Sequence, residues 1–567
     1  MKTNCTVRVK GDLAVRSGLN FARMEGDWYR PDEVFKADSH GWPGDWEGRV
    51  ILALTLLEQS VHRTSAYLDE IISMIPAHLN EKGYFGPILP EKTFDEQHFG
   101  GHSWMIRALA EYYKYKKQPD TLEILEHMVR NFILPVRGSY AQYPIEPGKR
   151  FEAKTPWILS HLQTKTQHHA ETSDAGCCFI MIDGATAAYE LLPIPELREV
   201  IDEMIARYME MDLEALNIQT HATLSAARGI LRLYRLTNDQ RYLDMALTRY
   251  KLYRSAAWTE CYGNFNWFGA PRWTEPCGII DSFIVAVSLW QYTGDVSFLN
   301  DSHLIYYNAL SHGNRINGSF GSDRCCGAVE TEDNLFLAPI NYETYWCCTM
   351  RGGEGFARAI EYCCLADSGS VTLPFFHSFE ADVTWGNESI AFEMISAYPF
   401  RDKIEITVKN ADLARPLELK LFKPDWAGNA ELSLNGEKQS AEALQGFIPL
   451  RKQFQTGDVI TLDLDMSVRC EETRFDNCVQ GYHKFFYGPM LLGHKAEKEI
   501  NTLDGNKFEN YAESKYKSAE TVSIPANAKL ERVGDGVFRT GDIELSALCS
   551  VRDMTREDTM RQILFHG

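Results

Sequence analysis

Residues 278–295, GIIDSFIVAVSLWQYTGD, indicate how the chain folds. Their apolar side chains recur at helical spacing, and the segment ends in a polar Thr-Gly-Asp turn. Residues 222–239, ATLSAARGILRLYRLTND, end in the same way, and an aromatic-Leu pair follows each turn. This repetition predicts a helical hairpin that is used several times. Such hairpins can close into a ring, an α/α toroid.

The helical pattern extends on both sides of these two segments, from about residue 40 to residue 365. Residues 47–62 and 101–116 are further long segments with apolar positions at helical spacing. We therefore assign residues 16–366 to one large helical domain.

After residue 366 the period of the pattern changes from helical to two. Ile404, Ile406 and Val408 alternate with polar residues, residues 460–466 do the same, and Asn435-Gly436 between them is a hairpin turn signal. We expect an antiparallel β-sandwich over residues 367–500 and a second, smaller β-rich region over 501–567. Residues 1–15 also contain an alternating stretch, which predicts a strand that joins a C-terminal sheet.

Composition and charge exclude several classes of protein. The 567 residues are 44% hydrophobic and carry a formal net charge of −20, with no local run of Lys or Arg. This charge disfavours binding to nucleic acid or to anionic membranes. The first residues lack the apolar core of a signal peptide, and no stretch is long and apolar enough to span a bilayer, so we expect a cytoplasmic protein.

Fourteen cysteines include four adjacent pairs, at 177–178, 325–326, 347–348 and 363–364. In a long chain without a secretion signal, this usage favours a reducing compartment over disulfides. Two adjacent thiolates can bind one soft metal ion, whereas each pair taken alone is also compatible with small core residues. His168-His169 lacks an accompanying ligand spacing, and we interpret it as a solvated loop.

One carboxylate and three thiols stand out before two predicted helices. Glu275 and Cys277 stand directly before the helix predicted over 278–292. Cys347 and Cys348 lead into the helix that contains residues 356–360. A helix N-terminus lowers the pKa of a thiol there. The four residues form a plausible tetrahedral Zn²⁺ set; the alternative is core cysteines beside a solvated glutamate.

The sequence around these residues resembles glycoside hydrolase families 127 and 146, the β-L-arabinofuranosidase group. The resemblance rests on Cys347-Cys-Thr-x-x-Gly-x-Glu354-x-x-Ala-Arg358, on Glu275-x-Cys277, and on Thr259-Glu-Cys-Tyr-Gly263. It covers nearly the whole chain and implies an (α/α)₆ barrel followed by β-sandwich domains. It also implies a retaining exo-glycosidase in which Glu275, Cys277, Cys347 and Cys348 hold zinc, Cys347 is the nucleophile and Glu260 is the acid/base.

The expected partner is an oligosaccharide from a plant cell-wall glycan or glycoprotein, and a homodimer is the expected assembly to test. Six residues are candidates for substrate binding: His102, His221, Trp46, Trp258, Trp267 and Arg351. Arg351 departs from the pattern of the family, and its guanidinium beside the nucleophile would suit a carboxylate.

Three alternative functions compete with the leading one. The same fold could act on another plant cell-wall sugar, such as a branched or carboxylated pentose. A non-catalytic carbohydrate-binding protein could keep zinc for structure alone, although it would not need Glu260. A thiol-based redox or metal-storage protein would bind several zinc ions per chain instead of about one.

Overall fold

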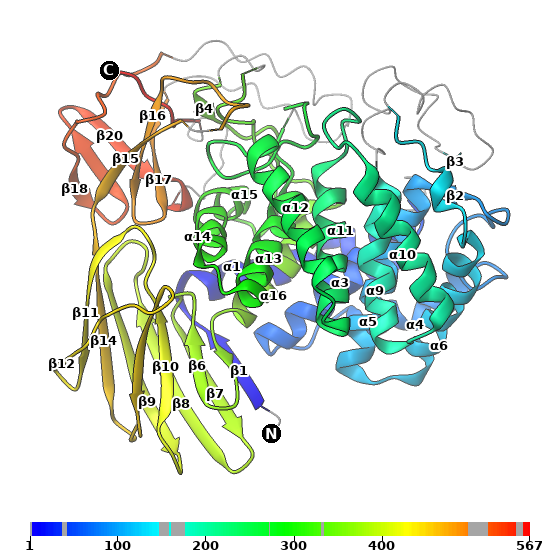
Figure 1. Cartoon of the computed structure of the whole chain (residues 1–567), viewed down its shortest axis with the longest axis horizontal. Coiled ribbons are helices and arrows are strands. Elements are labelled where there is room, and N and C mark those ends of the chain that lie inside the picture. The colour runs from blue at the N-terminus through cyan, green and yellow to red at the C-terminus, as the bar shows by residue number, and fades with distance from the viewer. Residues whose placement is uncertain are drawn as a thin grey trace.

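The computed structural model describes residues 3–36, 42–146, 158–159, 176–271, 273–329, 334–473, 475–496, 520–550 and 560–567. The helices form a barrel, and the sheets lie beside it and next to one of its ends (Figure 1). His168-His169 lies outside these residues. No described helix is long and apolar enough to cross a membrane.

Six helices form the inner ring of the barrel, and each contacts the next until the last returns to the first. In ring order they are α3 (Asp45–Val61), α5 (Glu96–Lys116), α9 (Met181–Leu191), α11 (Thr220–Thr237), α13 (Pro276–Thr293) and α16 (Cys348–Glu361). Four of them match the four helices that the periodicity predicts.

A second layer of helices covers this ring. Five of its members each follow the inner helix on which they pack, and α1 closes the layer over α16 and α3. They are α1 (Gly11–Met24), α4 (Leu68–His78), α6 (Pro119–Met128), α10 (Pro195–Glu210), α12 (Gln240–Ala256) and α14 (Val296–Leu304). This arrangement confirms the predicted (α/α)₆ barrel.

Short helical pieces extend or connect these layers. They are η1 (Asp27–Tyr29), α2 (Pro31–Val34), η3 (Val129–Ile133), η4 (Leu134–Val136), η5 (Tyr140–Gln142), η6 (Cys177–Ile180), η7 (Ile305–Leu310), α15 (Ser311–Gly313) and η9 (Leu548–Ser550).

The two similar turns in the sequence connect inner to outer helices in the same way. Asn238 ends α11 and Gly294 ends α13, both with a positive φ, and each backbone N–H donates to the carbonyl four residues earlier at 2.7 Å. The following Asp239 and Asp295 cap the N-termini of α12 and α14 through their carboxylates. The repeated turn therefore stops one helix and starts the next within two residues.

Two sheets pack face to face as the predicted β-sandwich. The larger has the order β1 (Thr3–Val9), β7 (Phe379–Trp385), β8 (Glu388–Ser396), β9 (Lys403–Asp412), β14 (Val459–Met466), β11 (Ala427–Leu434) and β12 (Glu437–Gln439). The smaller has the order β13 (Phe447–Lys452), β10 (Leu417–Phe422), β6 (Ser370–Leu373) and β5 (Leu365–Ala366), in which β10 and β6 run parallel.

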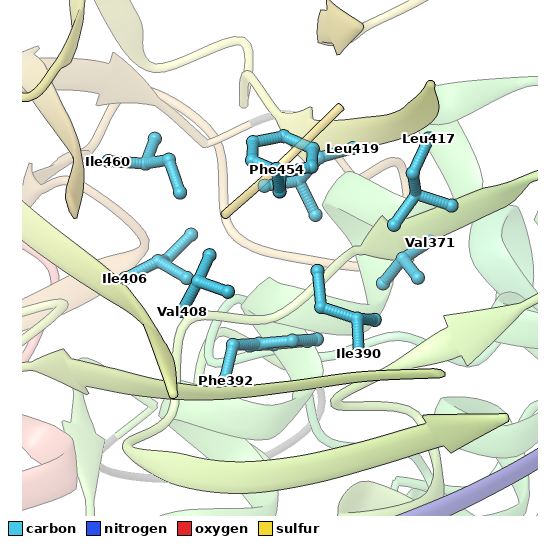
Figure 2. A pocket seen from close by; sticks show the side chains of 9 residues that line it. All are labelled: Val371, Ile390, Phe392, Ile406, Val408, Leu417, Leu419, Phe454 and Ile460. Atoms are coloured by element: carbon cyan, nitrogen blue, oxygen red, sulfur yellow. The ribbon is translucent and has the colours of Figure 1, made fainter. Parts of the chain in front are cut away.

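The inner faces of these sheets explain the alternating pattern. Ile404, Ile406 and Val408 of β9 are buried, and β9 pairs with the alternating β14 in antiparallel register. A small apolar cavity lies between the sheets (Figure 2), and its lining consists of Val371, Ile390, Phe392, Ile406, Val408, Leu417, Leu419, Phe454 and Ile460. The absence of polar lining identifies it as a gap in the sandwich core.

A third sheet lies near the end of the barrel where the inner helices begin (Figure 1). Its strands are β15 (Val468–Glu472), β16 (His483–Tyr487), β17 (Met490–Lys495), β20 (Ile543–Ala547), β19 (Val537–Thr540) and β18 (Glu531–Gly534), with β21 (Arg561–Gln562) and β4 (Phe336–Leu337) attached. The separate strands β2 (Phe94–Asp95) and β3 (Ile158–Leu159) pair in parallel.

Two predicted boundaries differ from the observed elements. The N-terminal strand ends at Val9, and residues 11–15 belong to α1, whose apolar side chains face the barrel. The third sheet begins at Val468 instead of residue 501, because β15 pairs with β16 and β17 pairs with β20 across the intervening chain. Strand alternation alone cannot tell to which of two sheets a strand belongs.

Gly48 permits the close approach of α3 and α5. A Cβ at this position would lie 2.3 Å from the backbone nitrogen of Met105. We expect Gly48→Ala to destabilise the protein by about 1–3 kcal/mol, because neither helix backbone can move without disturbing the ring. Gly18→Ala in α1 is the matched control, since no atom lies within 4 Å of its added Cβ. Equal thermal midpoints for the two variants would contradict the expectation.

Candidate active site

The inner helices begin at the same end of the barrel. Gly44, before α3, packs on Gly101 at the start of α5, and Cys277 at the start of α13 contacts Cys348 at the start of α16. The positive ends of the helix dipoles therefore converge there, and they favour thiolates and other anions. This end of the barrel is the candidate site.

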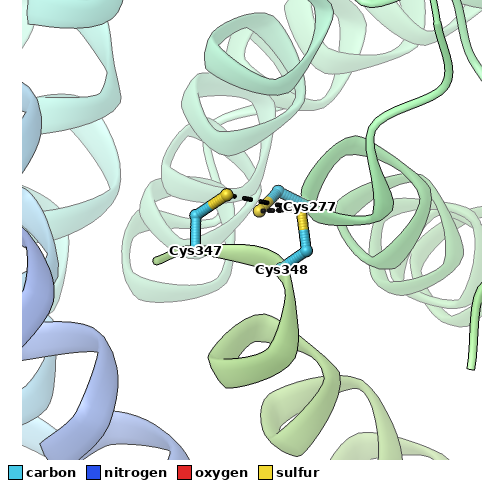
Figure 3. A group of neighbouring side chains, drawn as sticks. All are labelled: Cys277, Cys347 and Cys348. Carbon is cyan, nitrogen blue, oxygen red and sulfur yellow. Dashed lines mark hydrogen bonds between the residues drawn. The ribbon is translucent and has the colours of Figure 1, made fainter. Parts of the chain in front are cut away.

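Three thiols meet where α13 and α16 begin (Figure 3). The Sγ of Cys348 lies 3.7 Å from the Sγ of Cys277 and 3.3 Å from the Sγ of Cys347. Cys277 and Cys348 are buried, whereas Cys347, the N-cap residue of α16, is partly exposed. Cys347 is therefore the thiol of the three that is most open to a ligand.

Glu275 and His221 complete the group around Cys277. One carboxylate oxygen of Glu275, one ring nitrogen of His221 and the Cys277 sulfur all lie within 4.8 Å of one another. The sulfurs of Cys277, Cys347 and Cys348 also lie within 4.8 Å of one another. The four residues that the sequence predicts as ligands are thus gathered around Cys277. His221 is a further donor beside them, and its ring stacks on that of Trp104 with centroids 5.5 Å apart.

The donor set fits a soft divalent cation. Burial raises the pKa of the Glu275 carboxyl and of the Cys277 and Cys348 thiols, so the uncharged forms are favoured without a counter-charge. A bound cation would reverse this preference, since coordinated thiols lose their protons. Three sulfurs with one carboxylate oxygen or one imidazole nitrogen match the ligands of tetrahedral zinc sites.

Arg49 is a residue of this site that the sequence analysis missed. Its guanidinium donates to the Cys277 sulfur at 3.6 Å and to the Asp45 carboxylate at 2.9 Å. Although burial lowers the pKa of Arg49, the charges of Asp45 and Cys277 raise it above its usual value. The signal in the sequence is an arginine directly before the apolar run of α3 that begins at Val50, because a charge that this helix buries requires a partner.

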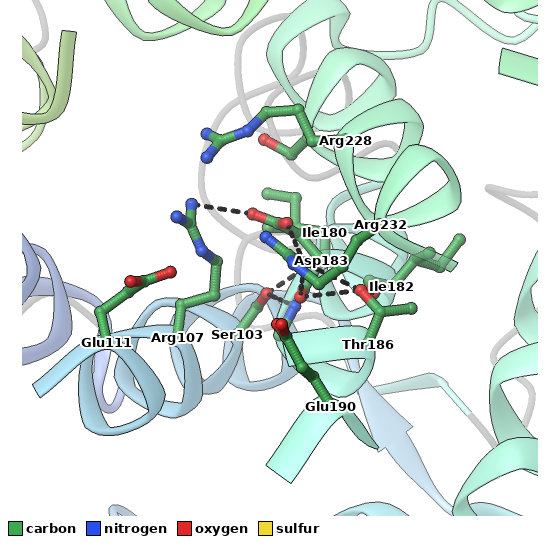
Figure 4. A network of polar contacts seen from close by, with 12 residues as sticks. Ser103, Arg107, Glu111, Ile180, Ile182, Asp183, Thr186, Glu190, Arg228 and Arg232 are labelled. Atoms are coloured by element: carbon green, nitrogen blue, oxygen red, sulfur yellow. Dashed lines mark hydrogen bonds and ion pairs between the residues drawn. The ribbon is translucent and has the colours of Figure 1, made fainter. Parts of the chain in front are cut away.

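A network of buried ion pairs crosses the barrel below the thiols. Arg107 donates to Asp183 at 3.0 Å, and Arg232 contacts Asp183 at 2.7 Å (Figure 4). Arg107 also donates to Glu354 at 2.8 Å. Although burial raises the pKa of Asp183, the guanidinium groups of Arg107 and Arg232 lower it below its usual range. The stabilisation from this carboxylate is therefore complete at neutral pH and is lost as the pH falls through its lowered pKa.

Arg351 belongs to the same network of buried ion pairs, and its contact with substrate stays a prediction. Its side chain is 1% exposed and forms ion pairs with Asp281 and Glu354. The Arg351 guanidinium lies over the Trp104 ring, 4.5 Å from its centroid, and Trp104 stacks on His221 of the site. In this conformation the guanidinium that would suit a carboxylated sugar is paired with the carboxylates of Asp281 and Glu354.

Three other predicted sugar contacts are also core residues. His102 is fully buried, accepts from the Phe85 N–H at 3.1 Å and stacks on Phe132. Trp258 is 0% exposed and Trp267 is 2% exposed. In this conformation the three side chains are packed in the core, and their contact with a sugar stays a prediction. Trp46, in contrast, lies in the first turn of α3. Its ring packs edge to face against Tyr345 of the site, and the two ring centroids are 5.7 Å apart.

Glu260 lies at the junction of the barrel and the third sheet. Its carboxylate forms a fully buried ion pair with Lys484 of β16 and accepts from the Phe475 N–H at 3.4 Å. Neither group of potential metal ligands among the described residues includes it. The structure therefore shows a partner that the sequence analysis missed, Lys484, and no sequence signal connects two residues 224 positions apart.

The remaining adjacent cysteine pairs are buried. Cys177, Cys178, Cys325, Cys326, Cys363 and Cys364 are each at most 3% exposed. This burial agrees with their interpretation as core thiols.

Part of the chain, in the β-sandwich and outside this site, matches a known protein family. Residues 371–466 match the family described as "Beta-L-arabinofuranosidase, GH127 middle domain". A search of curated proteins found no match.

Solved structures share the fold over the full length of the chain. A structure described as a glycoside hydrolase has a TM-score of 0.69 at 13% identity and covers 99% of this chain and 96% of its own. The GH127 β-L-arabinofuranosidase from Geobacillus stearothermophilus T6 has a TM-score of 0.68 at 14% identity, and the match covers 99% of this chain and 100% of that enzyme. A GH127 β-arabinofuranosidase has a TM-score of 0.65 at 13% identity, and the match covers 99% of this chain and 96% of that enzyme.

The (α/α)₆ barrel, its β-sandwich and the matching middle domain define the class of protein as a glycoside hydrolase. The family match over residues 371–466 supports the resemblance to the glycoside hydrolase family 127 group that the cysteine motif indicates.

Proposed function

We propose that the protein is a retaining exo-glycosidase that releases terminal β-L-arabinofuranosyl or similarly shaped residues from plant cell-wall glycans or glycoproteins. The observation that carries the proposal is the cluster of Cys277, Cys347 and Cys348 beside Glu275, at the end of the barrel where the helix dipoles converge. A homodimer and a cytoplasmic location remain predictions.

Zinc would be held by Glu275, Cys277, Cys347 and Cys348. When bound, it would keep the thiols deprotonated at neutral pH and would make a thiolate a better leaving group. Arg49 supports this arrangement, because its donation to the Cys277 sulfur stabilises the thiolate form.

In the proposed reaction, the Sγ of Cys347 attacks the anomeric carbon and the bond to the leaving oxygen breaks. Glu260 protonates that oxygen, and it then takes a proton from the water that displaces the sulfur. The partial exposure of Cys347 supports its role as nucleophile. For Glu260 the proposal requires its carboxyl to separate from Lys484 when a substrate binds.

Hydrolysis itself is tested with aryl glycosides of pentofuranoses and pentopyranoses in both anomeric configurations. Hydrolysis of β-L-arabinofuranosides with retained configuration in the first product would support the proposal. If none of the glycosides is cleaved while a cell-wall glycan still binds, a non-catalytic binding protein is the better description.

Zinc content provides a prediction that does not depend on activity. Wild-type protein is expected to contain about one zinc ion per chain, and Cys277→Ser less than half of that, because Cys277 lies at the centre of the ligand group. Cys363→Ser is the control, since this buried thiol lies just after α16, donates to the Ala359 carbonyl of that helix and should leave the zinc content unchanged. Elemental analysis of the purified proteins measures all three. Several zinc ions per wild-type chain would instead favour metal storage.

The role of Glu260 is tested by varying the leaving group. Glu260→Ala is expected to slow glycans by about 10²–10⁴-fold but to slow the glycosylation step of nitrophenyl glycosides less, because an acidic leaving group hardly needs protonation. Lys484→Met removes the ion pair and retains the carboxyl. A purely structural role would predict equal losses for all leaving groups, with a similar drop in the thermal midpoint of both variants.

A further inference from the structure

Aromatic side chains dominate the exposed edge of the site around Cys347. Tyr345 and Trp346 directly precede Cys347, and both are partly buried. Trp28 of η1 lies beyond Tyr345 and is 45% exposed, although a side chain of this size is normally buried in a monomer. Exposed aromatic residues beside a catalytic centre require an explanation.

Two of these residues, Tyr345 and Trp28, form a continuous row with Trp46 that leads outward from the site. The row consists of Trp46 in the first turn of α3, then Tyr345, whose centroid lies 5.7 Å from that of Trp46, and then Trp28, 4.3 Å from Tyr345. Trp28 and Tyr345 are stacked, with an angle of 15° between their planes. One face of Trp28 is therefore covered by Tyr345, and its 45% exposure leaves room for a ligand.

The row is held rigidly. The Tyr29 hydroxyl donates to the Tyr345 carbonyl at 2.8 Å, and the Thr344 N–H donates to the Phe320 carbonyl at 2.7 Å. Arg23 donates twice to the Glu343 carboxylate, at 2.9 and 2.7 Å, which ties the loop before α16 to α1. A rigid platform loses little conformational entropy when a ligand binds.

The direction of the row identifies its occupant, given the proposed function on which this inference rests. A sugar whose anomeric carbon faces the Cys347 sulfur lies at the inner end of the row, so the remainder of the glycan extends toward the exposed Trp28. Sugar rings present an apolar face of C–H groups to aromatic rings and direct hydroxyls to neighbouring polar groups. Asp27 and Arg30, both exposed beside Trp28, provide such groups.

We propose that Trp28 and Tyr345 form a binding subsite for a pyranose ring on the leaving-group side of the scissile bond. The subsite would select glycans in which the released sugar is attached to a pyranose backbone. Its affinity would depend on the exposed indole face of Trp28.

The test is native electrophoresis in gels that contain arabinoxylan or arabinogalactan. Wild type should be retarded by at least one of them, and Trp28→Ala should bind about tenfold more weakly, while Trp28→Phe keeps most of the affinity. Tyr115→Ala is the control, since Tyr115 is 38% exposed at the C-terminal end of α5, at the opposite end of the barrel. Equal retardation of wild type and Trp28→Ala, or no retardation of wild type by either glycan, would overturn the proposal.

Light scattering on the same proteins distinguishes a protein partner from a glycan. If wild type were a dimer and Trp28→Ala a monomer, the row would be a contact between copies of the chain, and the subsite would be disproved. Binding in the gels requires no turnover, so a wild type that binds through Trp28 but cleaves no glycoside would refute the proposed function and leave the subsite standing.

Discussion

Cys347→Ala is expected to lower kcat/KM on a cleaved glycoside by about 10⁴-fold or more, because the variant lacks the proposed nucleophile. Cys348→Ala is also expected to be impaired, since the two sulfurs lie 3.3 Å apart and share the candidate metal site. Loss of rate therefore cannot separate an attacking thiol from a ligand.

A covalent label makes this separation. A cyclophellitol-type epoxide of the matching sugar should add one sugar mass to the peptide that contains Cys347, since the Sγ of Cys347 opens the epoxide as it would displace the leaving oxygen. Peptide sequencing should show the label on Cys347, with Cys348 unmodified and no label in Cys347→Ala. Label on Cys348, on Glu354 or on another carboxylate would refute the assignment of the nucleophile, even if zinc were still bound.

The sequence was informative where local physics determines the structure. The turns that end at Asp239 and Asp295 predicted the repeated hairpin, because a left-handed residue and a carboxylate cap act within a few positions. The meeting of Cys277 with Cys347 and Cys348 was predictable for a related reason. Residues that open parallel inner helices of a closed ring must lie at the same end of it.

The sequence was less informative about depth within the barrel and about distant partners. Arg351 shares a helix face with Cys347, but helical spacing does not show that one turn separates an exposed sulfur from a fully buried guanidinium. The predicted helix over 101–116 placed His102 at a helix start, whereas α5 begins at Glu96, and the pattern did not show the hydrogen bond that His102 accepts from the Phe85 N–H. Lys484, the partner of Glu260, comes from a different sheet and could be found only from the fold.

The carboxylate of Glu354 is expected to be the largest single determinant of stability that we can test in the barrel. It is 1% exposed and accepts from Arg107, Arg228 and Arg351, which belong to three different inner helices. Glu354→Ala should cost about 3–5 kcal/mol, because it leaves buried guanidinium groups with too few counter-charges. The thermal midpoint measures this loss.

A surface variant provides the control for that measurement. Glu544 pairs with Arg539 and both side chains are 52% exposed, so Glu544→Ala should cost about 1 kcal/mol or less. The double variant Glu354→Ala, Arg107→Met should regain part of the stability, since it also removes one of the uncompensated charges. Similar midpoints for Glu354→Ala and Glu544→Ala would show that water or a rearranged carboxylate compensates the arginines. In that case the ion pairs of Glu354 would not be what holds α5, α11 and α16 together.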